Sequence, residues 1–317
     1  MSEAATVTAK GTTNSITRLL VTRFPIARFI VSIKPFLKWA GGKRRLAPTL
    51  RQYLPPLYQA FIEPFAGSAA LFFSLQPSCA LLSDSNERLI RTYRAVRDDV
   101  EAVIQLLNTY PNDPDFFESM RRRSDTIDAD SDTQVGAWFI YLNKTAFNGL
   151  FRVNRANQFN VPFGRYKSPT ICDVDTLRAC SAALQGVSIE HALFEETLRR
   201  AQPGDAVYLD PPYVPVTATS FVGYTADGFT GEQHCLLRDL VVDVKTNGVH
   251  VVISNSDTAL VRKLYSGRDF HLTPIVATRS IAASTSSRGA VGELIISSYR
   301  PGLRRALPRP RRVARSA

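Results

Sequence analysis

The sequence predicts an α/β protein with a mostly parallel sheet that ends in an antiparallel hairpin and carries a helical insertion. First, short apolar runs typical of strands alternate with helix-forming segments along much of the chain. Second, a polar and basic stretch at 87–172 interrupts this alternation. Third, the apolar run Ala206–Leu209 stops at Asp210, Pro211, Pro212 and Tyr213, because proline cannot continue a sheet ladder.

The elements are predicted in chain order from periodicity and from helix-capping residues. Phe61 and Ile62 form a strand that turns into a helix at 69–75, and a second strand at 80–84 ends at Asp84. Helical periodicity covers 87–110, and a further helix covers 131–147 with Ser131 or Asp132 as its cap. The remaining expectations are strands at 187–189, 206–209 and 249–253, helices at 232–244 and 257–265, and a terminal hairpin from 270–276 and 293–299.

These patterns divide the chain into a discontinuous domain and its flanks. Segments 36–86 and 173–300 are predicted to form the α/β domain, and 87–172 an inserted, mainly helical domain. The leader at 1–35 is expected to be disordered, although its lack of acids faintly resembles an organelle transit peptide. The Pro/Arg-rich tail at 301–317 is also expected to be disordered, and it either adds salt-sensitive affinity for phosphates or does nothing.

Composition excludes several classes of protein. No apolar run approaches the roughly 20 residues that span a bilayer, so no membrane association is expected. The four cysteines are scattered without a CxxC spacing, which indicates reduced thiols in a cytoplasmic protein. The four histidines do not pair at metal-ligand spacing, and we therefore expect no metal.

The net charge of +11 comes mainly from the flanks. The tail contributes +6 and the leader +4, which leaves +1 for 36–300. Within that region, 141–170 carries five basic residues and no acid. A local basic segment of this kind favours contact with nucleic acid, and a basic surface hairpin is the plainer alternative.

A cofactor cradle is predicted where the first strand turns into a helix. Small residues around Gly67 let a ligand approach the backbone, and the helix N-terminus offers free N–H groups. Asp84 ends the next strand, where an acid can accept hydrogen bonds from ribose hydroxyls. A single glycine and the acid Glu63 fit a pyrophosphate poorly, but Glu63 suits the cationic end of S-adenosylmethionine. An ordinary strand-to-helix turn is the alternative.

A second glycine-containing turn lies at 36–43. Gly41 and Gly42 let the backbone close over a ligand, while Trp39 and Lys43 offer an aromatic wall and a cation. The spacing of a P-loop is absent. A surface turn with Trp39 in the core is the alternative interpretation.

The cluster from Asp210 to Tyr213 combines a carboxylate, a fixed carbonyl and an aromatic face. An acid at the carboxyl end of a strand lies where open α/β sheets bind ligands. The cluster suits a planar base with an exocyclic amine: Asp210 and the Pro211 carbonyl accept its N–H groups, and Tyr213 stacks on the ring. A helix cap beside a proline turn with a core tyrosine is the alternative.

Three segments occur in an order that resembles the DNA adenine methyltransferase (Dam) family. They are F-L-K-W-A-G-G-K at 36–43, E-P-F-A-G-S-A-A-L-F-F at 63–73 and D-P-P-Y at 210–213. The similarity covers 36–300 and includes 142–154, 159–166, 217–221 with Tyr224, and 253–258.

The resemblance implies a class I S-adenosylmethionine-dependent methyltransferase with a Rossmann-like sheet. It implies methyl transfer from S-adenosylmethionine to the N6 amine of adenine in double-stranded DNA. The implied catalytic residues are Asp210, Pro211, Pro212 and Tyr213. The implied cofactor-binding residues are Trp39, Lys43, Glu63, Phe65, Gly67, Asp84, Phe194 and Asp210.

Two positions depart from the family pattern. Ala69 stands where many relatives have a second glycine, which alanine can replace if its φ is negative. Leu193 precedes Phe194 where relatives often place an acid, so one hydrogen bond to the cofactor adenine is in doubt.

The inserted domain would then recognise DNA around a flipped adenine, because the reacting amine is inaccessible inside a duplex. The family match implies a GATC site. It places Phe147, beside Asn148, as a wedge, Arg152 on a guanine, Leu150 and Pro162 on a thymine methyl, and Lys38 and Tyr166 near the first guanine. Arg155, Arg165 and Lys167 are expected to hold phosphates.

Other functions stay open at this point. The same chemistry could act on another DNA sequence or on RNA, and an inactive DNA-binding relative would keep the fold. A nicotinamide-dependent oxidoreductase is disfavoured by the single glycine and by Glu63. We expect a monomeric cytoplasmic protein of bacterial or phage origin. A role in restriction–modification, in a phage or in regulation fits equally well.

Overall fold

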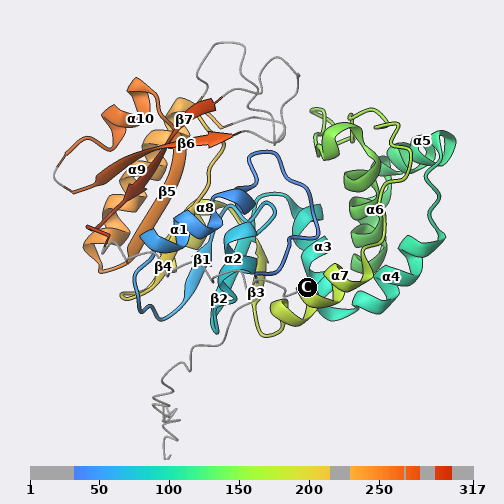
Figure 1. Ribbon diagram of the computed structural model, residues 1–317, viewed down its shortest axis with the longest axis horizontal. Helices are drawn as coiled ribbons and strands as arrows, with labels where there is room; N and C mark the ends of the chain where they lie inside the picture. The colour runs from blue at the N-terminus through green and yellow to red at the C-terminus, as the bar shows by residue number, and fades with distance from the viewer. Residues whose placement is uncertain (1–31, 215–228, 268, 279–289, 302–317) are drawn as a thin grey trace, which may run out of the picture. The chain divides into compact units, whose positions relative to one another are not determined.

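The computed structural model of the chain describes residues 32–214, 229–267, 269–278 and 290–301. These residues form a seven-stranded sheet in the order β3-β2-β1-β4-β5-β7-β6 (Figure 1). The strands are β1 Phe61–Glu63, β2 Ala80–Asp84, β3 Ser188–His191, β4 Ala206–Leu209, β5 His250–Ser256, β6 His271–Thr278 and β7 Ala290–Ser297. Strands β1 to β5 pair in parallel, and β7 runs antiparallel to both β5 and β6. The predicted sheet and its terminal hairpin are confirmed.

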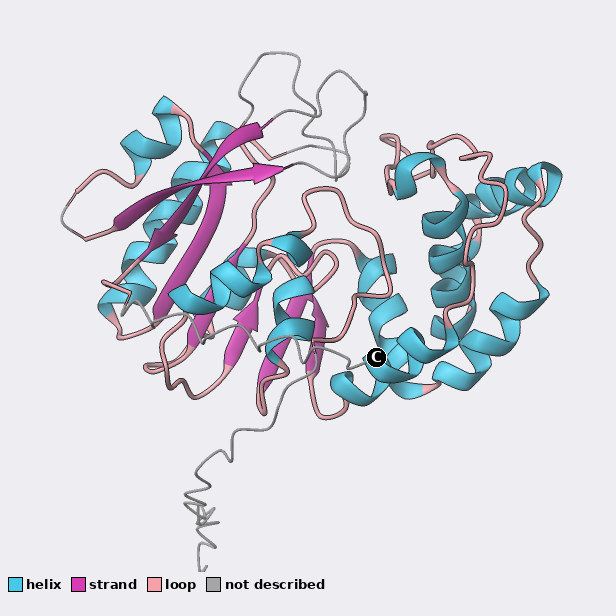
Figure 2. Cartoon of the chain, in the orientation of Figure 1, coloured by secondary structure: helices cyan, strands magenta, loops and turns pink. Residues whose placement is uncertain are grey.

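Helices follow most of the strands (Figure 2). The α-helices are α1 Ala47–Tyr53, α2 Ala70–Leu75, α3 Glu87–Asp98, α4 Val100–Thr109, α5 Pro114–Arg122, α6 Asp132–Thr145, α7 Val174–Leu184, α8 Phe194–Arg199, α9 Gly231–Thr246 and α10 Ala259–Leu264. Short 3₁₀ helices are η1 Lys43–Arg45, η2 Arg123–Asp125, η3 Ile127–Ala129 and η4 Phe147–Gly149. Within the described ranges, no helix has both the length and the apolar character to cross a membrane.

Both faces of the sheet are covered, because alternate strand residues point to opposite sides. Tyr208 of β4 belongs to a hydrophobic cluster that includes α1, α2, α3 and α6. Val207 and Leu209 belong to a second cluster, which includes residues of α8, α9 and α10. All of β4 is therefore buried, so a polar side chain can reach a ligand only after the strand ends, at Asp210.

The helical insertion differs from its prediction at one point. The periodic segment 87–110 is two helices, since the chain leaves the helical conformation at Asp99, with φ −149°. The Asp99 side chain then accepts a hydrogen bond from Ala102 N and caps α4. The prediction of one continuous helix is wrong because a capping aspartate can end one helix and begin the next without disturbing the apolar periodicity.

Helix α6 is the centre of the inserted region. Ser131 and Gln134 form the capping box at its start, in agreement with the predicted cap. The helix packs against α3, α4 and α5 and is buried from Val135 to Asn143. A helix that is buried on all sides is typical of the middle of a core. Its buried end therefore fixes the position of the first residues of the segment that follows, 146–167.

Some sequence predictions fall outside the described residues. These are the leader at 1–31, the tail at 302–317, and the family-like positions 217–221 and Tyr224.

Candidate active site

Asp210 lies directly after β4 and is held through one carboxylate oxygen. Lys43 Nζ, from η1, lies 2.9 Å from Asp210 Oδ1. Ser254 Oγ, from β5, donates a hydrogen bond of 3.0 Å to the same oxygen. Neither contact uses Oδ2, and the Asp210 side chain keeps 20% of its exposure. Both donors thus hold the same oxygen, so the ion pair leaves the carboxylate able to accept another hydrogen bond through Oδ2.

A buried tyrosine supports the serine. Tyr208 Oη lies 2.6 Å from Ser254 Oγ, and both residues are essentially unexposed. Because the single Ser254 hydroxyl hydrogen goes to Asp210, Tyr208 must be the donor to Ser254. The resulting chain runs from Tyr208 through Ser254 to Asp210. It fixes the rotamer of the carboxylate from inside the sheet.

The ion pair lies in a region of low solvent access. Burial raises the pKa of Asp210 even though Lys43 and Ser254 act in the opposite direction. Burial alone would lower the pKa of Lys43, but attraction by Asp210, Tyr208 and Glu293 outweighs it and raises the pKa. Lys43 is therefore a secure cation, and it opposes the protonation of Asp210.

Tyr213 completes the cluster at the carboxyl end of β4. Its ring centroid lies 4.6 Å from Lys43 Nζ, and its hydroxyl donates to Glu293 Oε2 of β7 at 3.1 Å. Burial, with Asp210 and Glu293 nearby, raises the pKa of Tyr213 well above its ordinary value. Tyr213 is therefore a neutral ring held between Lys43 and Glu293.

The predicted cofactor loop is held by its own backbone contacts. Asp84 accepts hydrogen bonds from Gly67 N and Asn86 N, each at 3.0 Å. Tyr93 Oη donates to Gly67 O at 2.8 Å. A carboxylate has about four acceptor positions, so Asp84 can still accept from a hydroxyl beside these backbone donors. Burial raises the pKa of Asp84.

Glu63 is the feature that points to a cationic ligand. Its side chain is buried, and Oε2 has no hydrogen-bond partner among the described residues. Burial, together with the charges of Asp210 and Asp84, raises the pKa of Glu63 well above its usual range. The negative charges of Asp210 and Asp84 thus act on a third carboxyl group, that of Glu63. A sulfonium or ammonium group would relieve this excess of acid, so the residues present fit S-adenosylmethionine.

Aromatic rings lie on both sides of the cofactor loop. Phe65 stacks on Phe194 with centroids 5.3 Å apart, and Phe229 lies 5.9 Å from Phe65. Trp39 lies against Gly67, where an added Cβ would be 2.8 Å from Trp39 Cδ1. The structure thus places Trp39, Gly67, Phe65 and Phe194 around one loop.

The condition placed on Ala69 is not met. Its φ is +47° and its ψ +37°, in the left-handed region, at the start of α2. The alanine therefore adopts a conformation that glycine takes more easily. An alanine is strained here by about 1–2 kcal/mol relative to an ordinary backbone conformation.

Substitutions at Gly67 and Ala69 should differ in their effect on the free energy of unfolding. Gly67→Ala combines a left-handed φ of +46° with a clash against Trp39. We expect its free energy of unfolding to fall by about 2–4 kcal/mol. Ala69→Gly relieves strain but loses a buried methyl and adds unfolded-state entropy, so its stability should stay within about 1 kcal/mol of the parent. Denaturant unfolding checks both, and equal losses would contradict the assignment of strain.

The predicted DNA-contacting residues of the insertion converge around η4. Phe147 is 44% exposed, and its N–H donates to Pro162 O at 2.9 Å. Asn148 adopts a φ of +55°. Arg152 donates from Nε to Asn160 Oδ1 at 2.6 Å and from Nη2 to Asn160 O at 3.1 Å. The segment that follows α6 therefore carries an exposed aromatic ring and a guanidinium oriented by Asn160.

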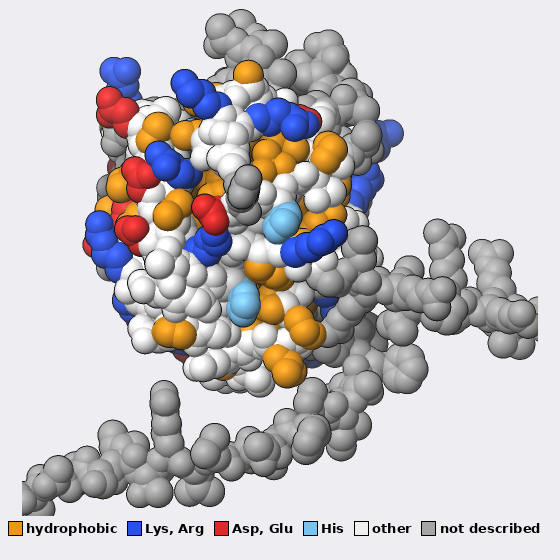
Figure 3. Space-filling view, turned by 90° about the vertical axis from the view of Figure 1, so that its left-hand side faces the viewer, with side chains coloured by type: hydrophobic (Ala, Val, Ile, Leu, Met, Phe, Trp, Pro, Cys, Tyr) orange, Lys and Arg blue, Asp and Glu red, His pale blue; other side chains and the backbone are white. Residues whose placement is uncertain are grey.

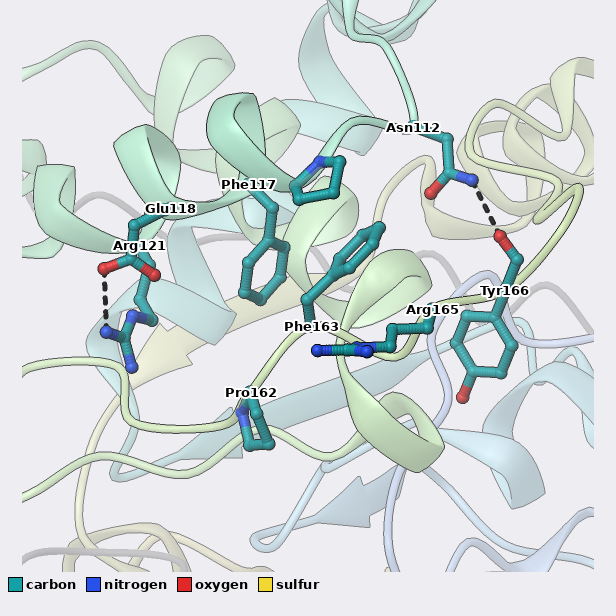
Figure 4. Close-up of a pocket in the computed structure, with 9 residues that line it drawn as sticks. Asn112, Phe117, Glu118, Arg121, Pro162, Phe163, Arg165 and Tyr166 are labelled. Carbon is teal, nitrogen blue, oxygen red and sulfur yellow. Dashed lines mark hydrogen bonds and ion pairs between the residues drawn. The ribbon is translucent and has the colours of Figure 1, made fainter.

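A pocket of about 770 Å³ borders this surface (Figure 4). The Arg165 side chain extends past Phe163 toward Pro162, while the Tyr166 ring turns away from it. The lining residues are Asn112, Pro114, Phe117, Glu118, Arg121, Pro162, Phe163, Arg165 and Tyr166. Arg121 is paired with Glu118 at 2.7 Å, so Arg165 is the cation that this pocket offers to a ligand.

A second pocket, of about 420 Å³, is strongly basic. Its lining includes Lys34, Lys38, Lys144 and Lys167, and a single acid, Asp173. Burial, with Lys34 and Lys38 nearby, lowers the pKa of Lys144 to about 8. By contrast, the face shown in Figure 3 mixes basic, acidic and hydrophobic side chains. The basic pocket is therefore the better candidate for contact with phosphates.

Sequence reasoning missed four residues that hold the site together: Tyr208, Ser254 and Glu293 beside Asp210, and Asn143 beside Lys38. Ser254 and Glu293 had one usable signal, since each interrupts or adjoins an apolar strand with a polar side chain. Among the residues that the structure describes, no group of three or more His, Cys, Asp or Glu is placed to hold a metal ion.

The chain is similar in sequence to several known proteins. Residues 39–281 match the family described as D12 class N6 adenine-specific DNA methyltransferase. The Type II methyltransferase M1.LlaDCHI of Lactococcus lactis is 41% identical, over 85% of this chain and 96% of the relative. M.MjaIII of Methanocaldococcus jannaschii, also a Type II methyltransferase, is 35% identical over 85% of this chain and its own full length. A DNA adenine methylase of Salmonella typhi is 32% identical over 85% and 96%.

Proposed function

The chain belongs to the D12 class N6 adenine-specific DNA methyltransferases, and from that premise we propose that it methylates adenine within GATC sites of duplex DNA. The adenine is flipped out of the helix and into the site at Asp210. S-adenosylmethionine supplies the activated methyl group. The strongest support comes from the carboxylate of Asp210: Lys43 and Ser254 both hold Oδ1, which leaves Oδ2 for a substrate.

The target amine needs activation, because its lone pair is delocalised into the purine ring. Asp210 Oδ2 accepts one N–H, and the Pro211 carbonyl accepts the other. Two acceptors favour a tetrahedral nitrogen, whose lone pair is then free to attack. The nitrogen becomes cationic during transfer, and the fixed carboxylate stabilises that charge. The proton leaves after transfer, so no strong base is required.

The same residues hold the two reactants. Glu63 would hold the cationic part of the cofactor, Asp84 its ribose hydroxyls, and Phe65 and Phe194 its adenine. Tyr213 stacks on the target base, and its bond to Glu293 keeps the ring in place. Lys43 maintains Asp210 in its charged form.

Segments 36–86 and 173–300 form the catalytic domain in this proposal, and 87–172 the target-recognition domain. Phe147 fills the space that the flipped adenine leaves. Arg152, oriented by Asn160, reads a guanine edge, and Leu150 and Pro162 contact a thymine methyl. Lys38 and Tyr166 contact the first guanine, while Arg165 and Lys167 contact phosphates.

The test is methyl incorporation from labelled S-adenosylmethionine into otherwise identical duplexes with and without GATC. We expect incorporation at N6 of the GATC adenine alone. A folded protein that methylates neither duplex would contradict the proposal, and methylation of a different sequence would keep the chemistry but overturn the GATC assignment. A 2-aminopurine at the target position, which fluoresces when unstacked, tests base flipping in the same duplex.

A further inference from the structure

Lys38 differs from the other predicted DNA-contacting residues in its origin. The others lie at 147–167, after α6, whereas Lys38 precedes η1 and belongs to the segment that leads to Trp39 and Lys43. Residues from two distant parts of the chain can read one DNA site together only if something fixes their relative positions. A positional error near 1 Å is enough to weaken a specific contact.

Asn143, near the end of α6, makes that connection. Its Oδ1 accepts a hydrogen bond from Lys38 N at 2.8 Å, and its Nδ2 donates to Lys38 O at 2.7 Å. The same Nδ2 donates to Gly149 O at 3.0 Å. The side chain is fully buried, at 0% exposure. A carboxamide can make this pattern because it accepts and donates at once, whereas neither aspartate nor leucine can.

Gly149 provides a second observation at the same junction. Its φ is +65°, and an added Cβ would lie 2.3 Å from Lys38 Cδ. The backbone after Phe147 and Asn148 therefore runs directly against the Lys38 side chain. On its far end, Lys38 Nζ lies 5.0 Å from the centroid of the Tyr166 ring. Lys38 is thus held at its backbone by Asn143, along its stem by Gly149 and at its head by Tyr166.

We propose that Asn143 is a positioning residue that sets Lys38 in register with the readers on 147–166. Discrimination at the base pair that Lys38 contacts then depends on Asn143. Discrimination at the base pair that Arg152 contacts does not, because Asn160 orients Arg152 separately. The inference rests on the proposed function, since it concerns DNA sequence reading by the same protein.

The experiment measures kcat/KM on the duplex that the parent methylates and on its single base-pair variants. Lys38→Ala first identifies the base pair at which Lys38 acts. Asn143→Ser should lose discrimination at that same pair by about tenfold and leave discrimination at the other pairs within about threefold. The double variant Lys38→Ala/Asn143→Ser should match Lys38→Ala alone, because Asn143 acts through Lys38.

Two further variants separate positioning from plain stability. Thr145→Val removes another buried hydrogen bond of α6, from Thr145 Oγ1 to Tyr141 O at 2.7 Å, without touching Lys38. It should keep the discrimination profile of the parent. Gly149→Ala displaces the Lys38 side chain through its added Cβ and should reproduce the discrimination profile of Asn143→Ser. It also tests the proposal if Asn143→Ser does not fold.

Three results would overturn the inference: a uniform loss at every base pair, an unchanged profile in folded Asn143→Ser or Gly149→Ala, or additive losses in the double variant. These failures are distinct from failure of the proposed function. If the parent methylates no DNA, both proposals fall. If the parent methylates a defined site and the variants show one of these three results, the positioning role alone is wrong.

Discussion

Asp210→Asn should lower the rate of methyl transfer by about 10²–10³-fold, because the site loses the fixed negative charge beside a nitrogen that becomes cationic. The amide has nearly the same shape, but its one oxygen faces the donors Lys43 and Ser254, so the substrate amine meets an NH2 group. The loss therefore reports on the charge and on the hydrogen bond of Oδ2 together. Binding of S-adenosylhomocysteine, followed by the shift in melting temperature, should persist. Single-turnover methylation of a GATC duplex is the direct measurement.

The control must account for the buried lysine that this substitution leaves without its partner. Breaking a buried pair costs about 3–5 kcal/mol of stability, so part of any defect could come from folding. Asp205→Asn is a matched change at the other end of β4, where Asp205 accepts from Ala60 N and Gln202 N. It should lower stability and leave transfer by the folded protein near the parent rate. If Asp210→Asn turns over as fast as the parent, catalysis does not occur at this carboxylate.

Lys43→Met should move the acid limb of the activity profile toward higher pH by about 1–3 pH units. Activity needs the charged form of Asp210, so it falls as the pH falls through the pKa of that carboxyl. Burial already raises this pKa, and Lys43 holds it down. Removal of the cation lets the pKa rise further, and the loss of activity then begins at a higher pH.

The profile of kcat against pH, measured in saturating DNA and cofactor, checks this expectation. Lys245→Met is a suitable control. Lys245 lies on α9, pairs with Asp269 at 2.9 Å and has no contact with Asp210 among the described residues. Its acid limb should coincide with that of the parent. An unmoved limb in Lys43→Met, in a protein that stays folded, would mean that the Lys43–Asp210 pair does not govern the charge of the carboxylate.

The strands could be predicted from sequence with small errors at their ends. Ala206–Leu209 agrees with β4, and the terminal hairpin agrees with β6 and β7. Apolar strands bounded by turn residues leave few other conformations open. Helix ends were harder, since Asp99 divides 87–110 through a cap that periodicity does not show. The left-handed φ of Ala69 had no signal, because alanine at that position normally indicates a helix.

The candidate site divides in the same way. Glu63 and Asp84 end their strands and Asp210 follows one. The carboxyl ends of parallel strands meet at one edge of the sheet, so these acids can be expected together without knowledge of the whole fold. The partners of Asp210 could not be predicted from strand ends. Lys43 is about 170 positions from Asp210 in the sequence and Ser254 is 44 away, and each belongs to a different element. The sequence around a buried serine or asparagine does not indicate which residue its side chain will hydrogen-bond.

By itself the sequence determined the order of the strands and helices, the acids at the strand ends and the basic character of 141–170. These are local properties, set by periodicity, turn chemistry and composition. Tertiary structure alone decided which oxygen of Asp210 the two donors hold, why Glu63 Oε2 finds no hydrogen-bond partner among the described residues, and how Asn143 joins Lys38 to Gly149. Hydrogen-bond partners depend on distances of a few tenths of an ångström between segments far apart in the chain, and only the packed fold sets such distances.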